Sequence, residues 1–159
     1  MSGIRIVWGT ASAPTKLASY DAALADAGIE NYNLVSVSSV IPADVPLDTV
    51  GSAPELGPIG GRLTVVEARA TTAGPGQVSA GLGWSRTVDD GPGLFYEAAG
   101  ETDPETVETR LLEGLECGQE LRGWEFTDPR VHIESATANA DGYTTTVVVA
   151  VYGHSEPIL

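Results

Sequence analysis

The stretch from Asn33 to Pro42, NLVSVSSVIP, places the strongest constraint on how this chain can fold. Its first half is apolar and rich in β-branched residues, which predicts a short strand over residues 34–37 that is packed on both faces. Pro42 disfavours helix in the residue before it and indicates a change of chain direction. The adjacent Ser38 and Ser39 therefore fall where a strand ends, a place where serines are also common for purely structural reasons.

Only two segments of the chain have helical periodicity. The rest of the sequence alternates strand-like runs with turns. Residues 15–27 form the first helix, ending at Gly28, and residues 102–121 form the second, which opens with a Thr-Asp-Pro-Glu capping box. Apolar residues at helical spacing predict the buried faces: Leu17, Tyr20 and Leu24 in the first helix, and Val107, Leu111, Leu112 and Leu115 in the second. About seven strands with two widely separated helices favour an α+β fold over repeated βαβ units.

Two connections have clear turn signals. Residues 43–61 are rich in proline and glycine and are predicted to be a loop. Residues 131–138 and 143–152 alternate as strands, and the Asn-Ala-Asp-Gly sequence at 139–142 predicts a hairpin between them.

Length and composition favour a single domain over residues 1–159 in the cytoplasm. The chain has 159 residues, 42% of them hydrophobic, which is enough to bury one sizeable core. No apolar run approaches the roughly 20 residues of a membrane span. The N-terminus lacks the charged and apolar regions of a signal peptide.

The charge balance is strongly acidic, with 22 acidic against 8 basic residues and a formal net charge of −14. Such a surface repels nucleic acid and anionic membranes, so neither is expected as a partner. Because the acidity is spread along the whole chain and Lys16 is the only lysine, we interpret it as halophilic adaptation to a salt-rich cytoplasm.

The cysteine and histidines give no indication of a metal centre. Cys117 is the only cysteine, so it forms no internal disulfide, and we expect it to be a small buried residue of the second helix. His132 and His154 have no metal-ligand spacing. We therefore expect no metal.

Residues 21–42, DAALADAGIENYNLVSVSSVIP, resemble the self-cleavage region of pyruvoyl-dependent arginine decarboxylases. In that family a helix and a strand lead into a Ser-Ser bond that the protein cuts by itself. The resemblance covers most of the chain. It implies a four-layer αββα sandwich, self-cleaved into a short β chain and a longer α chain and assembled as a homotrimer of αβ units.

The same resemblance implies cleavage between Ser38 and Ser39. The Ser39 hydroxyl would attack the Ser38 carbonyl to give an ester, and elimination and hydrolysis would leave a β chain of residues 1–38 and an α chain of residues 39–159. The α chain would begin with a covalent pyruvoyl group derived from Ser39. Pyridoxal phosphate enzymes supply a lysine for their cofactor, whereas a pyruvoyl group needs none. The single lysine, Lys16, is compatible with a pyruvoyl enzyme that uses neither pyridoxal phosphate nor a metal.

The resemblance also assigns roles to residues that bind substrate or move a proton. Glu97, in the stretch GLFYEAAG, matches the catalytic glutamate and would act as general acid. This stretch lacks the histidine that often follows in the family. Asp21 matches the carboxylate that meets the substrate guanidinium. Leu24 and Val40 match apolar positions that flank the substrate, and Asn33 matches a residue near the processing site.

Each of these residues also has an ordinary structural interpretation. Asp21 and Glu97 are typical surface carboxylates, Leu24 suits a core, and Asn33 suits a turn. The function implied is conversion of L-arginine to agmatine and CO₂, with agmatine available for polyamine synthesis. Two alternatives stay open: a pyruvoyl decarboxylase for another amino acid, and a non-enzymatic trimeric scaffold or small-ligand binder of the same fold.

Overall fold

The computed structural model describes residues 3–138 and 141–159. These residues form nine strands and two helices, in the order β1 (Ile4–Ala13), α1 (Lys16–Asp26), β2 (Asn33–Ser36), β3 (Val40–Ile41), β4 (Leu47–Gly51), β5 (Arg62–Ala73), β6 (Gly76–Arg86), β7 (Gly93–Gly100), α2 (Pro104–Glu120), β8 (Arg130–Ala138) and β9 (Tyr143–Glu156). The mixture of separated helices and mainly antiparallel strands agrees with the predicted α+β class. Neither helix in this described part is long and apolar enough to cross a membrane.

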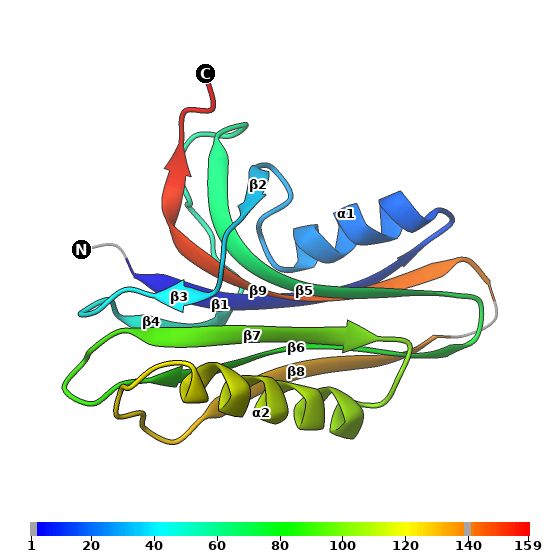
Figure 1. The fold of residues 1–159 in the computed structure, drawn as a ribbon. Coiled ribbons are helices and arrows are strands. Elements are labelled where there is room, and N and C mark those ends of the chain that lie inside the picture. The colour runs from blue at the N-terminus through cyan, green and yellow to red at the C-terminus, as the bar shows by residue number, and fades with distance from the viewer. Residues whose placement is uncertain (1–2, 139–140) are drawn as a thin grey trace.

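The strands form two sheets that face each other. One has five strands in the order β2-β5-β9-β1-β4, and the other has four in the order β3-β7-β6-β8. Helix α1 lies on the outer face of the five-stranded sheet and α2 on the outer face of the four-stranded sheet (Figure 1). Because β2 and β3 are consecutive but belong to different sheets, the chain crosses between the sheets at residues 37–39.

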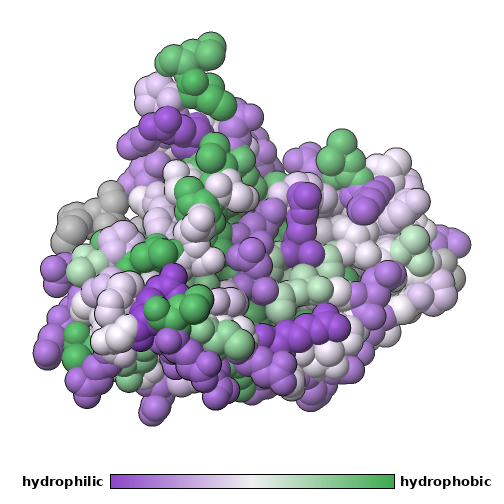
Figure 2. Space-filling model, viewed as in Figure 1, coloured by the Kyte–Doolittle hydropathy of each residue, from purple (hydrophilic) through white to green (hydrophobic). Residues whose placement is uncertain are grey.

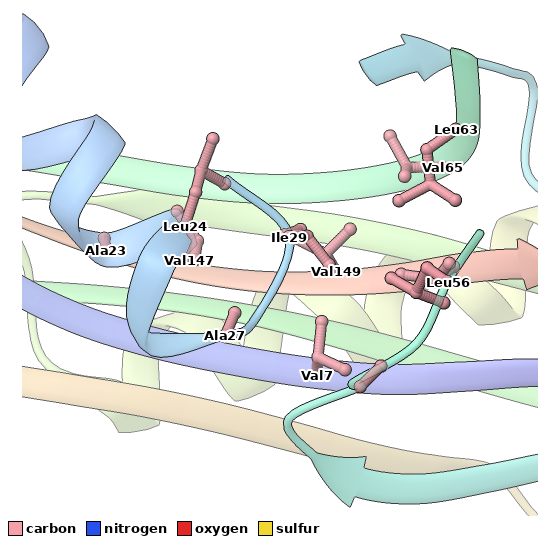
Figure 3. Packing of buried hydrophobic residues seen from close by; sticks show 12 residues of the cluster. Val7, Ala23, Leu24, Ala27, Ile29, Leu56, Leu63, Val65, Val147 and Val149 are labelled. Carbon is pink, nitrogen blue, oxygen red and sulfur yellow. The ribbon is translucent and has the colours of Figure 1, made fainter. Parts of the chain in front are cut away.

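Two hydrophobic clusters hold these layers together, and β9 contributes to both. Val147 and Val149 point toward α1, where they pack with Leu24 in the first cluster (Figure 3), to which Val151 also belongs. The alternate residues Val148 and Ala150 point into the second cluster, between the two sheets. A strand covered on both faces requires a continuous apolar run, and the valine-rich sequence of β9 supplies it.

Helix α1 is shorter than predicted and buries a narrower face. Its N-cap is Thr15, whose hydroxyl accepts a hydrogen bond from the Ala18 amide at 3.1 Å. Ala23 and Leu24 are buried against the sheet. The prediction that Leu17 is buried is wrong: it is 75% exposed, because the first turn of the helix projects beyond the first hydrophobic cluster.

Helix α2 is capped one residue later than predicted. Asp103 rather than Thr102 is the N-cap, and its carboxylate accepts a hydrogen bond from the Thr106 amide at 2.7 Å. Of the predicted buried face, Val107, Leu111 and Leu115 are buried as expected, whereas Leu112 is exposed. Cys117, expected to be buried, is also exposed. Both lie off the single stripe that packs on the four-stranded sheet.

Two predicted connections differ from the structure. The loop predicted at residues 43–61 contains β4, which pairs in parallel with β1 and raises the strand count above the predicted seven. Residues 139 and 140 of the predicted hairpin lie outside the described residues. The flanking strands do not form a hairpin ladder, however, because β8 belongs to the four-stranded sheet and β9 to the five-stranded sheet. Turn composition signals a reversal of the chain without specifying which sheet receives the next strand.

Candidate functional site

Strand β2 lies at a sheet edge, which corrects the prediction of a strand packed on both faces. It pairs in parallel with β5, and after it the Val37 amide donates to the Val65 carbonyl at 3.0 Å. Val35 and Val37 are 43% and 41% exposed. An apolar, β-branched run therefore identified the strand correctly, but it did not reveal that this short strand has a neighbour on one side only.

The serine pair spans the gap between the two sheets. Ser38 follows the last bond to β5, and the Ser39 carbonyl accepts a hydrogen bond from the Phe95 amide of β7 at 2.7 Å. Val40 then pairs with Leu94 in the four-stranded sheet. Ser38 is exposed and Ser39 half-buried.

The backbone forms a tight turn centred on Ser39. The Val40 amide donates to the Ser38 carbonyl oxygen at 2.9 Å, an i to i+2 hydrogen bond that defines a γ-turn. The carbonyl group of Val40 in turn accepts a hydrogen bond from the Tyr152 hydroxyl at 2.9 Å. The turn therefore supplies the Ser38 carbonyl oxygen, which precedes Ser39, with a backbone donor.

This turn fits a covalent group made from the chain itself. The Ser39 hydroxyl is one residue away from a carbonyl already polarised by a backbone N–H, and such a donor stabilises negative charge that develops on the oxygen during attack. By contrast, residues 3–138 and 141–159 contain no group of three or more His, Cys, Asp or Glu side chains arranged to hold a metal ion.

A hollow lies directly beyond the turn, between two strand edges that have no partner there. Strand β2 covers β5 only as far as Val65, and β3 covers β7 only as far as Leu94. Past these points, the open edges of β5 and β7 and one side chain of α2 line a hollow of about 480 Å³; the lining residues are Glu67, Ala68, Arg69, Glu97, Ala98, Ala99 and Arg110.

Glu97 enters this hollow two residues beyond Phe95, which bonds to Ser39. Alternation along β7 puts Phe95 and Glu97 on the same face of the strand, about 7 Å apart along it. Although the Glu97 side chain is open to solvent on one side, the surrounding protein raises its pKa by desolvation, and the negative charge of Glu67 raises it further. Both effects shift Glu97 toward its protonated form relative to a free glutamate, which is the direction that a general acid needs.

Glu67 belongs to a polar network that sequence reasoning missed. The Tyr20 hydroxyl of α1 donates to Glu67 Oε2 at 2.6 Å, and the Arg69 guanidinium lies 3.9 Å from Oε1. The same guanidinium lies 4.5 Å from the centre of the Tyr20 ring. Burial and the adjacent Glu67 raise the pKa of Tyr20 to about 12, so it remains a donor. The i, i+2 spacing of Glu67 and Arg69 could have indicated that both side chains lie on one face of a strand. The contact between Glu67 and Tyr20 of α1 joins residues far apart in the sequence, so no local pattern could have predicted it.

The structure does not bring Asn33 to the turn of its own chain. Its side-chain amide donates to the Gly60 carbonyl at 2.7 Å, and its backbone amide donates to Gly61. Five residues of extended chain separate it from Ser38, a distance of roughly 16 Å. Within one chain, therefore, Asn33 stabilises the start of β2 and does not contact the Ser38 carbonyl.

The other predicted substrate-binding residues lie in different surroundings. Val40 is beside the turn and 43% exposed, whereas Leu24 is 7% exposed and packs in the cluster beneath α1. Asp21 is exposed on α1 and is not among the residues that line the Glu97 hollow. The structure thus brings together Ser38, Ser39, Val40 and Glu97, and leaves Asp21, Leu24 and Asn33 apart from them.

Comparison with known proteins gives one consistent result. A family model described as pyruvoyl-dependent arginine decarboxylase matches residues 3–157. The chain is 54% identical over 158 residues to a pyruvoyl-dependent arginine decarboxylase of Halobacterium salinarum, covering 99% of this chain and 98% of the relative. Proteins with the same description from Methanopyrus kandleri and Pyrococcus abyssi are 35% identical over 146 residues and 38% identical over 118 residues. The alignment with the Methanopyrus kandleri protein covers 92% of both chains. The alignment with the Pyrococcus abyssi protein covers 74% of this chain and 73% of the relative.

Proposed function

The chain belongs to the pyruvoyl-dependent arginine decarboxylase family, and we propose that it cuts itself between Ser38 and Ser39 to make the group with which it converts L-arginine to agmatine and CO₂. Membership makes the chain a carboxy-lyase that depends on a covalent pyruvoyl group and not on pyridoxal phosphate. The Halobacterium salinarum relatives agree with a halophilic interpretation of the acidic composition. The observation that carries the proposed cleavage is the hydrogen bond from Val40 N–H to the Ser38 carbonyl.

In the proposed self-cleavage, the Ser39 Oγ bonds to the Ser38 carbonyl carbon and the peptide C–N bond breaks, while the hydroxyl proton passes to the nitrogen. The Val40 amide, 2.9 Å from the carbonyl oxygen, stabilises the charge on that oxygen during the shift. Loss of the Ser39 α-proton then breaks the Cβ–Oγ bond and releases the Ser38 carboxylate. Water converts the remaining enamine to a ketone and ammonia, leaving residues 1–38 and 39–159 as the β and α chains.

A pyruvoyl group at position 39 supplies the electron sink that decarboxylation needs. The Phe95 amide, 2.7 Å from the Ser39 carbonyl oxygen, holds that oxygen in place and stabilises negative charge on it. The raised pKa of Glu97 favours its protonated form more than in a free glutamate, and we propose that Glu97 delivers this proton to the substrate α-carbon, because it lies on the same strand face as Phe95. Protonation at this step makes Glu97 the proposed general acid.

The proposed substrate contacts involve the residues matched by the family pattern. A carboxylate at Asp21 suits the planar guanidinium of arginine because it accepts two of its N–H groups at once. Val40 flanks the substrate next to the turn. We propose that Leu24 contributes indirectly, by packing the helix that carries Asp21, and that Asn33 serves the site without contacting the Ser38 carbonyl of its own chain.

We also propose that the active enzyme is a homotrimer of αβ units with four-layer αββα subunits. Hydrophobic patches lie over β2 and beside β3, among largely hydrophilic surroundings (Figure 2). The exposed residues Val35 of β2 and Val40 of β3 belong to these strands, and the exposed Val37 lies in the segment between them. A neighbouring copy would cover this apolar surface, and it would allow Asp21 and Asn33 of one chain to serve Ser39 of another. Light scattering in molar salt tests the trimer, and a monomeric active enzyme contradicts it.

The activity itself is tested by following agmatine release from L-arginine in high salt. Wild type should produce agmatine and release little product from ornithine or lysine, which lack a guanidinium. Glu97→Gln should still be cut but lose about 100-fold or more in turnover, whereas Ser39→Ala should be neither cut nor active. Comparable turnover of another amino acid would favour the alternative substrate, and an uncut, inactive wild type would favour the scaffold.

A further inference from the structure

Tyr152 connects the turn at Ser39 to the opposite sheet. It lies on β9, the central strand of the five-stranded sheet, where it pairs with Ile4 and Thr64. Its hydroxyl donates to the Val40 carbonyl at 2.9 Å. Val40 itself is paired with β7 in the four-stranded sheet, so this hydrogen bond joins the two sheets at the residue that follows the serine pair.

Together with Phe95, Tyr152 holds the turn from both sides. The Phe95 amide binds the Ser39 carbonyl at 2.7 Å, and its ring packs against the Tyr152 ring edge to face, with centres 6.3 Å apart. Two successive carbonyls are therefore fixed by groups from different sheets, while the Val40 amide between them is left to bond to Ser38. Rotation of the Val40 peptide would break at least one of these bonds.

We propose that Tyr152 is a positioning residue for self-cleavage, because its hydroxyl holds the Val40 carbonyl and so fixes the turn at Ser39 in which the Val40 amide donates to the Ser38 carbonyl. This role rests on the proposed function. Reaction between two groups of one chain is fast only when they are held in a near-attack geometry. After cleavage the same bond would still tie Val40, next to the new end of the α chain, to β9, while the Phe95 amide ties residue 39 to β7.

The surroundings of Tyr152 suit a permanent donor. The ring is half-buried against the second hydrophobic cluster, which includes Phe95, and burial raises the pKa of its hydroxyl to about 12. The hydroxyl therefore keeps its proton at physiological pH. Arg86 also bonds to carbonyls downstream, at Pro42 and Val45, but those lie beyond the turn and stabilise the loop that follows it.

The test is Tyr152→Phe, which removes the hydroxyl and keeps the ring. Precursor made by cell-free translation in molar salt is followed by intact-protein mass spectrometry, so that the rate of cleavage is read without any assay of decarboxylation. The rate should fall about tenfold, equivalent to about 1.4 kcal/mol of barrier. Tyr143→Phe, at the far end of the same strand, is the matched control and should cleave at the wild-type rate.

A second measurement separates positioning from general loss of structure. In the uncleavable Ser39→Ala background, Tyr152→Phe should speed hydrogen exchange of the Val40 and Ile41 amides and leave exchange in β6 unchanged. Cleavage of Tyr152→Phe at the wild-type rate, or unchanged exchange at residues 40–41, would overturn the role of Tyr152 while leaving the proposed function intact. A wild-type precursor that stays whole would instead overturn the proposed function and this role together.

Discussion

At the scale of single residues, two carboxyl groups follow the strand residues that bond to the segment around the serine pair, each by two positions. Glu67 lies two residues past Val65, which binds Val37, and Glu97 lies two residues past Phe95, which binds Ser39. Both line the same hollow. Glu67 is held by Tyr20 and Arg69 with only 12% of its side chain exposed, so it is a fixed negative charge that disfavours ionisation of Glu97.

Replacing Glu67 by Gln should move the pH dependence of turnover. If Glu97 is the general acid, as we propose, it acts in its protonated form, and activity should fall as pH rises through its pKa. Removing the Glu67 charge lowers that pKa, so the fall should begin at a lower pH in Glu67→Gln than in wild type. The pH profile of kcat checks this, with Glu101→Gln as a control of equal charge change. A profile that does not move would show that Glu67 does not act on Glu97.

At the residue scale, the site residues were predicted from the resemblance to the family, and not from periodicity, composition or turn signals. Ser38, Ser39 and Glu97 were identified by resemblance, and the structure places them along one turn and one strand. Tyr152, by contrast, is more than a hundred residues from Val40, and a single sequence carries no signal for a contact between two sheets. Asn33 and Asp21 were matched by motif, but a motif does not specify whether such residues would act at Ser39 of their own chain or at Ser39 of a neighbouring copy.

At the scale of elements, the site exists because two short strands end early. If β2 and β3 ran the full length of β5 and β7, they would cover the edges that carry Glu67 and Glu97. The change of sheet at residues 37–39 is therefore what opens the hollow. Sequence patterns located both helices and seven of the nine described strands, since those depend on local periodicity, and they missed the short strands β3 and β4. They failed on the edge position of β2 and on the sheet membership of β8 and β9, which depend on distant pairing.

Helix α2 gives a stability prediction at this scale. It approaches β7 closely at Gly118, where an added Cβ would lie 2.7 Å from the Tyr96 ring. Gly118→Ala should therefore destabilise the fold by about 1–3 kcal/mol through overpacking, although alanine normally favours a helix. Gly123, just beyond the helix, has no atom within 4 Å of such a Cβ, so Gly123→Ala is the matched control. Denaturant unfolding compares the free energies of unfolding of the two variants. A Gly118→Ala variant as stable as wild type would contradict the close packing.

At the scale of the whole molecule, charge governs stability. A net charge of −14 gives self-repulsion that salt screens, since the Debye length shrinks from about 10 Å at 0.1 M to about 3 Å at 1 M. The midpoint of thermal unfolding should therefore rise steadily as KCl is raised from 0.1 M to molar concentrations. Scanning calorimetry of the uncleavable Ser39→Ala chain checks this without interference from processing. A midpoint independent of salt would contradict halophilic adaptation.

The central claim concerns the whole chain, because the proposed self-cleavage would convert one polypeptide into an enzyme of two chains. Intact-protein mass spectrometry of the purified, untagged protein in high salt tests it most directly. We predict two species that separate between Ser38 and Ser39, with the larger one blocked at its N-terminus and reactive toward ketone reagents. A single uncut mass that persists after prolonged incubation would contradict the account, since the chain would then lack the group on which its catalysis depends.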